Sequence, residues 1–449
     1  MVALTVGTSS RGRSLVDAHS GAIAGSDAAW EALFAAYGVH RVDDLGELAD
    51  SLECFAIGRR VRRRGSGIAT VHDSGAERVL AADLAELLGV PFAPLSAATT
   101  ERLATILDPG LAPTNPLDVW GTGKDAEDTL ADCLTALADD PAVDVVALAV
   151  DLVPEYDGDE SFPQALGRLL GHTDKPVAVL ANLSSAIDGP LAADLRAAGI
   201  PVLEGTRSGL RALGHLLDHA TRPPAPATYV DEARRARWTE RLRAGDVDPF
   251  ALLIDYGVPV VTSLAATDRD ATVAAADAAG YPVVLKTANA EVRHKLEVDG
   301  VRLHLADRDA VAAAYADLAT RLGPSVVVQP DVPSGVEVAL GMWRDPLVGP
   351  LVLVAAGGAL VELLAERSVA LPPVTPGRAA ELVARLRLSE LLAGHRGGPA
   401  LAREALVDAV VAFSQLALEL GDLLEAVDVN PLVVGRDGVV AVDALVIPR

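Results

Sequence analysis

Short apolar runs alternate with helical stretches through the first half of the sequence. The first run, "VALTVG", is followed by a glycine-containing loop and by "SDAAWEALFAAYG", whose apolar positions recur at helical spacing and which ends on Gly38. Further apolar runs follow, each separated from the next by a helical stretch: "GIATVHD", "AVDVVALAVDLV", "PVAVLANL" and "GIPVLEG". Strands that alternate with helices predict a parallel sheet with helices on both faces.

The pattern changes near residue 217. Over 217–247 a proline-rich segment is followed by a charged one, which predicts a linker that leads into a first helix. Beyond it the strand-like runs come in pairs, among them "YPVVLK" with "VRLHL", which indicates an α+β domain with antiparallel sheet. The chain closes with a helical stretch over 400–420 and two apolar runs around the turn "GRDG", which predict a hairpin.

The composition narrows the classes of function. A chain of 449 residues, half of them hydrophobic, can form about two to four domains. Its 62 acidic and 38 basic residues give a net charge of −24, which disfavours binding to nucleic acid and to anionic membranes. The basic run "GRRVRRRG" carries no interleaved aromatic residues, so we expect a solvated loop rather than an anion site.

The cysteines and the apolar segments indicate the cellular compartment of the protein. Cys54 and Cys133 stand in apolar, helical stretches far apart in sequence, which indicates reduced core thiols rather than a disulfide or a metal site. No secretory signal pattern follows Met1, and the most apolar later run, 347–365, is interrupted by proline, glycine and glutamate, as in buried strands. We therefore expect a cytoplasmic protein with no membrane partner.

Three oxygen-bearing side chains stand in the apolar strands of the closing hairpin. Asp428, Asn430 and Asp443 would be costly to bury unpaired, and hard oxygen ligands suit Mg²⁺. On these residues alone, strand-end caps beside Pro431 and the turn are an equally good interpretation.

Lys286 ends the run "YPVVLK", where a strand would deliver one ammonium group to an edge or a cleft. The ammonium could bind a nucleotide phosphate, or it could extend into solvent from a strand terminus. The loop that follows, "TANAEVRHKLEVDGV", holds His294, Lys295 and Gly300 and could close over polyphosphate through backbone N–H groups.

Together these pieces resemble an ATP-grasp domain. The motifs "GYPVVLK", "HKLEVDGVRLHL", "GVEVALG", "GGALVELL", "LPPV" and "VDVNPLVVG" resemble the nucleotide-binding part of the NDP-forming acyl-CoA synthetases, the family of acetate–CoA ligase (ADP-forming) and of succinyl-CoA synthetase. In the first half, "AHSGAIAGSDAAWEALFAAYG" resembles the phosphohistidine segment of that family, and "GIATVHDSGAERVLAADLAELLG" with "PTNPLDVWGTG" resembles its ligase domain.

The resemblance implies an α/β protein in which flavodoxin-like parallel-sheet ligase domains are followed by an α+β ATP-grasp domain. The expected parts are the C-terminal remnant of an α/β domain with the phosphohistidine loop over 1–60, a flavodoxin-like ligase domain of the succinyl-CoA-synthetase type over 65–216, a linker over 217–247 and an ATP-grasp domain over 248–449.

The resemblance also implies a reaction and its phosphoryl carriers. Such synthetases interconvert acyl-CoA, ADP and phosphate with carboxylate, CoA and ATP through an acyl phosphate and a phosphohistidine. A neutral imidazole is nucleophilic near pH 7, and His19 matches the phosphorylated histidine, with Ser20 and Gly21 as its phosphate loop. His294 matches a second carrier of some members; the alternative is a loop histidine that only hydrogen-bonds phosphate.

The remaining site residues follow from the same match. The nucleotide-binding set would be Lys286, Gly300, Gln329, Val332 and Glu337, and the Mg²⁺ ligands would be Asn430 and Asp443. The implied ligands are ATP or ADP, Mg²⁺, coenzyme A as a substrate, and a small carboxylate or its acyl-CoA. A homo- or hetero-oligomer is expected, with no nucleic-acid partner.

The sequence departs from the family's pattern at several points. No CoA-binding domain precedes His19, so we expect a separate CoA-binding subunit, a longer reading frame or a loss of synthetase activity. Ala370 replaces an arginine before "LPP", Pro330 replaces an acidic hinge residue, and Asp299 replaces a loop glycine. Two other functions stay open: an impaired nucleotide-binding regulatory or scaffold subunit, and another ATP-grasp carboxylate ligase, such as a carboxylate–amine ligase, with no role for His19.

Overall fold

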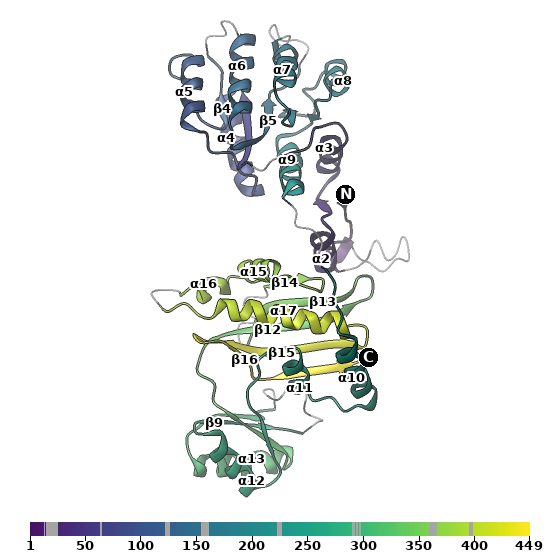
Figure 1. Cartoon of the computed structure of the whole chain (residues 1–449), viewed down its shortest axis with the longest axis vertical. Helices are drawn as coiled ribbons and strands as arrows, with labels where there is room; N and C mark the ends of the chain where they lie inside the picture. The colour runs from purple at the N-terminus through teal and green to yellow at the C-terminus, as the bar shows by residue number, and fades with distance from the viewer. Residues whose placement is uncertain are drawn as a thin grey trace. The chain divides into compact units, whose positions relative to one another are not determined.

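The computed structural model describes residues 1–12, 14, 26–62, 65–121, 126–153, 161–221, 227–289, 292, 295, 298–358, 366–394 and 398–449. The chain divides into two compact units (Figure 1). We call Met1–Ala24 with Tyr37–Ala225 the first unit, and Gly25–Ala36 with Pro226–Arg449 the second unit.

The first unit contains a five-stranded parallel sheet with the order β4-β3-β5-β6-β7. Alternate strand residues enter two different cores: Val71 and Leu148 pack with α5, α6 and α7, whereas Ile68 and Ala147 pack with α3, α4 and α9. The expected parallel sheet with helices on both faces is therefore confirmed. Its elements are α3 (Leu45–Ala56), β3 (Gly67–His72), α4 (Gly75–Leu88), α5 (Ala97–Ile106), β4 (Leu117–Asp118), α6 (Ala126–Asp139), β5 (Val143–Ala149), α7 (Ser161–His172), β6 (Val177–Leu180), α8 (Gly189–Ala197), β7 (Val202–Leu203) and α9 (Thr206–Ala220), and a separate parallel pair joins β1 (Val2–Leu4) to β2 (His40–Val42).

The second unit contains two antiparallel sheets, as the paired strand runs predicted. A four-stranded sheet has the order β10-β9-β11-β8, and α12 and α13 share its core. A larger sheet has the order β14-β13-β12-β15-β16, with β17 also paired to β15, and α17 lies across it (Figure 1). The elements are β8 (Leu264–Ala266), α12 (Arg269–Ala279), β9 (Val283–Thr287), β10 (Val301–Leu305), α13 (Arg308–Leu322), β11 (Val326–Pro330), β12 (Val336–Asp345), β13 (Gly349–Ala356), β14 (Arg367–Ala370), α15 (Pro376–Ala384), α16 (Leu388–Leu392), α17 (Arg403–Leu420), β15 (Leu424–Val434), β16 (Val439–Ala441) and β17 (Ala444–Pro448).

Two helices differ from the expected division of the chain. Helix α2 (Asp27–Tyr37) lies in the segment assigned to the first α/β part, yet its Ala29 and Ala32 pack against Leu351 of β13 in the second unit. Helix α10 (Glu232–Ala244) lies in the predicted linker, and with α11 (Pro249–Asp255) it contributes to the main core of the second unit. Apolar residues on both helices thus join a core that is distant in sequence.

The buried cysteines fit the expected core thiols. Cys54 and Cys133 are both free, and burial raises the pKa of each thiol to about 12. Residues 349–356 of the long apolar run form β13, and within the described part of the chain no helix has the length and apolar character that a membrane crossing needs.

A buried carboxylate joins α10 and α11 to α17. Glu419 is fully buried; its oxygens accept hydrogen bonds from Arg234 at 2.7 and 3.0 Å and from the Tyr256 hydroxyl at 2.8 Å. Further bonds come from the Gln415 amide and the Asp231 N–H. Burial alone would raise the pKa of Glu419, but these donors outweigh it and lower the pKa to about 2.

We expect Glu419→Gln to lower the free energy of unfolding by about 2–4 kcal/mol at pH 7, because the Arg234 guanidinium then loses its charged partner. The ionised Glu419 carboxylate stabilises the fold fully above its ordinary pKa of 4.5, and this stabilisation is lost as the pH falls toward 2. The difference in free energy of unfolding between wild type and variant should therefore become smaller over that range. Urea unfolding followed by tryptophan fluorescence measures it. Glu425→Gln, at an exposed position of β15, is the control; equal effects of the two variants would contradict the prediction.

Candidate functional site

Strand β9 carries Lys286 into the interior of the second unit. Lys286 pairs with Val301 of β10 and with Val327 of β11, and its side chain is buried. Its ammonium donates a hydrogen bond to the carbonyl oxygen of Val442 at 2.6 Å. Burial lowers the pKa of Lys286, and the nearby Asp443 carboxylate opposes that shift. The alternative prediction, in which the Lys286 ammonium extends into solvent from the end of a strand, is therefore wrong. The ammonium points at the segment between β16 and β17.

The two predicted metal ligands lie opposite one another, Asn430 on β15 and Asp443 in the segment between β16 and β17. Val429 of β15 pairs with Ala444 of β17, and the N–H of Val442 donates to the carbonyl of Pro431 at 3.1 Å. These two contacts place Asn430 and Asp443 at facing positions between them. The strand-cap interpretation does not account for Asp443, whose carboxylate contacts the Lys295 ammonium across 148 positions of sequence.

A glycine turn after β13 brings Glu337 to the same place. Gly358 donates its N–H to the Asn430 side-chain oxygen at 3.1 Å, and Gly357 donates to the Glu337 carbonyl at 2.8 Å. A Cβ on Gly358 would lie 1.5 Å from the Glu337 carboxylate, and the residue has a φ of +53°. An alanine there would be strained by the positive φ and would force the Glu337 carboxylate to move from its present position.

These oxygen donors fit a hard cation such as Mg²⁺. Among the residues that the structure describes, no group of three or more His, Cys, Asp or Glu side chains could hold a metal by themselves. Mg²⁺ commonly uses one or two carboxylates together with substrate phosphates and water. Glu337, Asn430 and Asp443 supply two carboxylates and one amide oxygen, and the neighbouring Lys286 could bind the substrate phosphates.

The other predicted nucleotide residues surround β9 and β11. Gln329 is buried and donates its side-chain amide to the Ser263 hydroxyl at 2.9 Å, and Val332 follows β11 at a half-buried position. Gly300 donates its N–H to the carbonyl of Lys295 at 2.7 Å. Asp299, which replaces a family glycine, adopts a φ of +51°, and both its carboxylate oxygens accept hydrogen bonds from Arg302, so its charge is balanced.

The predicted phosphoryl carriers are not placed by the structure. His19, Ser20 and Gly21, together with His294, lie outside the described residues. Conversely, the sequence did not single out the contact between Lys295 and Asp443 or the role of Gly358. The pair "GG" at positions 357 and 358 is the sequence signal that a close backbone approach occurs there.

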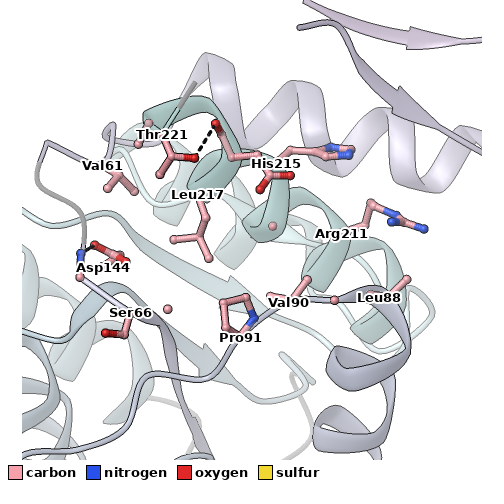
Figure 2. Close-up of a pocket in the computed structure, with 16 residues that line it drawn as sticks. Val61, Ser66, Leu88, Val90, Pro91, Asp144, Arg211, His215, Leu217 and Thr221 are labelled. Atoms are coloured by element: carbon pink, nitrogen blue, oxygen red, sulfur yellow. Dashed lines mark hydrogen bonds between the residues drawn. The ribbon is translucent and has the colours of Figure 1, made fainter. Parts of the chain in front are cut away.

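A cavity of about 410 Å³ in the first unit contains none of the predicted site residues. Figure 2 shows Val90, Pro91 and Leu217 on its walls, with Asp144 and His215 also lining it. Gly67 is the first residue of β3, so the cavity lies by the amino ends of the strands. Ligands of open α/β sheets bind at the carboxyl ends, so this cavity is not our candidate site.

Two known protein families match parts of this chain. A family described as "ATP-grasp domain" matches residues 235–447, and one described as "Succinyl-CoA ligase like flavodoxin domain" matches residues 1–55. The β subunit of acetate–CoA ligase (ADP-forming) I from Pyrococcus furiosus is 34% identical over 45% of this chain and 90% of its own length.

Two longer relatives align along nearly all of the chain. Acetate–CoA ligase (ADP-forming) I of Archaeoglobus fulgidus is 28% identical over 99% of this chain, and a trans-feruloyl-CoA synthase from an unidentified prokaryote is 30% identical over 100% of it. The chain spans 65% and 64% of the lengths of these two relatives.

We expect Gly358→Ala to destabilise the second unit more than Gly349→Ala does. Both glycines have a positive φ, at +53° and +86°, but a Cβ on Gly349 meets nothing within 4 Å. The shared backbone cost is about 1–2 kcal/mol, and the contact with Glu337 should add about 1–3 kcal/mol at Gly358 alone. Urea unfolding measures both variants, and adding Glu337→Ala should recover part of the extra loss. Equal losses at the two glycines would refute this account of the turn.

Proposed function

Because the chain belongs to the family of ADP-forming acetate–CoA ligases, we propose that it is the nucleotide-binding, phosphohistidine-bearing part of an ADP-forming acyl-CoA ligase. The reaction interconverts acyl-CoA, ADP and phosphate with carboxylate, CoA and ATP. The observation that carries the proposal is the buried Lys286 ammonium, which is directed at the segment between β16 and β17, next to Asp443. An ammonium beside oxygen donors for Mg²⁺ is suited to a nucleotide polyphosphate.

The residues of the second unit have distinct tasks in this proposal. Lys286 binds phosphate oxygens from the rigid centre of a sheet, so little side-chain entropy is lost when the nucleotide binds. Asn430, Asp443 and Glu337 would hold Mg²⁺, which supplies charge neutralisation of the phosphates when it is bound. Gly300, Gln329 and Val332 line the nucleotide on the side of β9–β11.

His19 carries the phosphoryl group in the proposed reaction. Its imidazole nitrogen attacks the phosphorus of an acyl phosphate, the P–N bond forms, and the P–O bond to the carboxylate breaks. ADP then attacks the phosphohistidine, so the P–N bond breaks and ATP leaves with the group. Backbone N–H groups at Ser20 and Gly21 bind the phosphoryl oxygens, and His294 would serve as a second carrier near the nucleotide.

The proposed reaction also needs a CoA-binding part, because CoA is one of its substrates. One relative is named as a β subunit, which supports a protein of this family assembled from separate chains. We therefore propose an oligomer, formed either by copies of this chain or by this chain with a separate CoA-binding subunit.

We expect Lys286→Met to weaken ADP binding in the presence of Mg²⁺ about tenfold to a hundredfold, because a charged hydrogen bond to phosphate is lost. Lys175→Met is a matched control, since Lys175 also donates to a backbone carbonyl at 2.6 Å and burial also lowers its pKa, but it lies in the first unit. Isothermal titration calorimetry measures both affinities. Unchanged affinity in Lys286→Met would refute the assignment of this lysine.

Incubation with γ-labelled ATP and Mg²⁺ should leave an acid-labile, base-stable label on the chain. His19→Ala should abolish the label, and His172→Ala, whose exposed ring pairs with Asp139, should retain it. Nucleotide binding without any label would favour the regulatory or scaffold subunit. Ligase activity that is unchanged in His19→Ala would favour an ATP-grasp carboxylate–amine ligase.

A further inference from the structure

The Asp443 carboxylate is paired with a second lysine. The Lys295 ammonium lies 3.0 Å from one carboxylate oxygen of Asp443 and 3.1 Å from the other. The side chains are 26% and 37% exposed, so water reaches the pair. A cation therefore already sits across both oxygens of a proposed Mg²⁺ ligand.

The backbone of Lys295 is held in place from the end of β9. The Lys295 carbonyl accepts the Gly300 N–H at 2.7 Å, and the Gly300 carbonyl accepts the Thr287 N–H at 2.9 Å. A Cβ on Gly300 would lie 2.9 Å from the Lys295 carbonyl oxygen, so the approach depends on glycine. Thr287 directly follows Lys286, so the two lysines near Asp443 are linked through the same strand end.

The choice of lysine is unusual for this chain. Only four of its 38 basic residues are lysines, and two of those four are Lys286 and Lys295. Arginine binds a carboxylate through two parallel hydrogen bonds in a fixed plane, whereas an ammonium is a point charge on a flexible stem. Lysine is therefore the better residue where the contact has to break and the ammonium has to move.

We propose that Lys295 is a displaceable counter-cation for Asp443: it holds the carboxylate until a nucleotide polyphosphate draws the ammonium away and leaves the carboxylate to the divalent cation. This inference rests on the proposed function, because it requires a nucleotide site at Asp443. Lys295 is a positioning residue for the cation and a phosphate contact once the nucleotide is bound.

Charge explains why the exchange depends on the nucleotide. Mg²⁺ and the ammonium repel one another and compete for the same two oxygens, so the cation alone binds poorly. A polyphosphate offers the ammonium several anionic oxygens, so Lys295 leaves Asp443 without losing its ion pair. Cation and nucleotide then favour one another's binding by the same factor, as linkage requires.

The test titrates the full chain with Mn²⁺, whose free aquo ion is visible by electron paramagnetic resonance. Without nucleotide, Lys295→Met should bind Mn²⁺ about tenfold more tightly than the wild type, because the competitor is gone. Saturating ADP should increase the affinity for Mn²⁺ in the wild type. In Lys295→Arg this increase should be about tenfold smaller, because the new guanidinium stays bound to the Asp443 carboxylate through two hydrogen bonds. Lys175→Met should match the wild type, and thermal melting checks that each variant is folded.

The outcomes separate the two proposals. If ADP and Mn²⁺ bind together in the wild type but Lys295→Met leaves the affinity for Mn²⁺ alone unchanged, the counter-cation role is overturned and the nucleotide site stands. If Lys295→Arg behaves as wild type in both titrations, the preference for lysine has no part in the exchange and the inference also fails. If the wild type binds no ADP with or without Mn²⁺, the proposed function fails and the inference fails with it.

Discussion

The hydrogen bond from Lys286 to the Val442 carbonyl is the contact on which the site depends. An ammonium is costly to bury without a partner, so the four-stranded sheet has to keep Lys286 against a fixed acceptor. That acceptor belongs to the segment between β16 and β17, and both of these strands pair with β15. The bond therefore joins two sheets that have separate cores and sets Lys286 beside Asp443.

The same constraint explains which parts of the fold and site could be predicted from sequence. The parallel sheet and the paired strands follow from local periodicity, which the sequence displays directly. Lys286, Asn430 and Asp443 could be selected because polar groups in apolar strands need partners. The identity of those partners could not be predicted, because Lys286 and Val442 are 156 positions apart and nothing local fixes such a contact.

Helix α2 is a second example of a long-range contact that the sequence does not show. Its apolar positions predict a helix that packs on something, and the structure confirms the helix. The surface that covers Ala29 and Ala32 is β13 of the second unit, more than three hundred positions away, so chain order alone does not show where the helix packs. Likewise Asp299, which the sequence showed only as a replacement for a loop glycine, is paired with Arg302, a neighbour whose side-chain direction no periodicity shows.

Two ion pairs of the second unit differ in burial and in the number of hydrogen-bond donors that hold the carboxylate. Glu419 is fully buried and held by several donors, so its pairing with Arg234 joins α10 to α17 and would be costly to break. The pair of Lys295 and Asp443 is partly exposed and rests on one ammonium, so water lowers the cost of opening it. The fold can thus contain an ion pair that exchanges partners, that of Lys295 and Asp443, because other contacts, such as that of Glu419 and Arg234, stabilise the fold. This separation lets a polyphosphate rearrange the charges around Asp443 while β9, β15 and β17 keep their register.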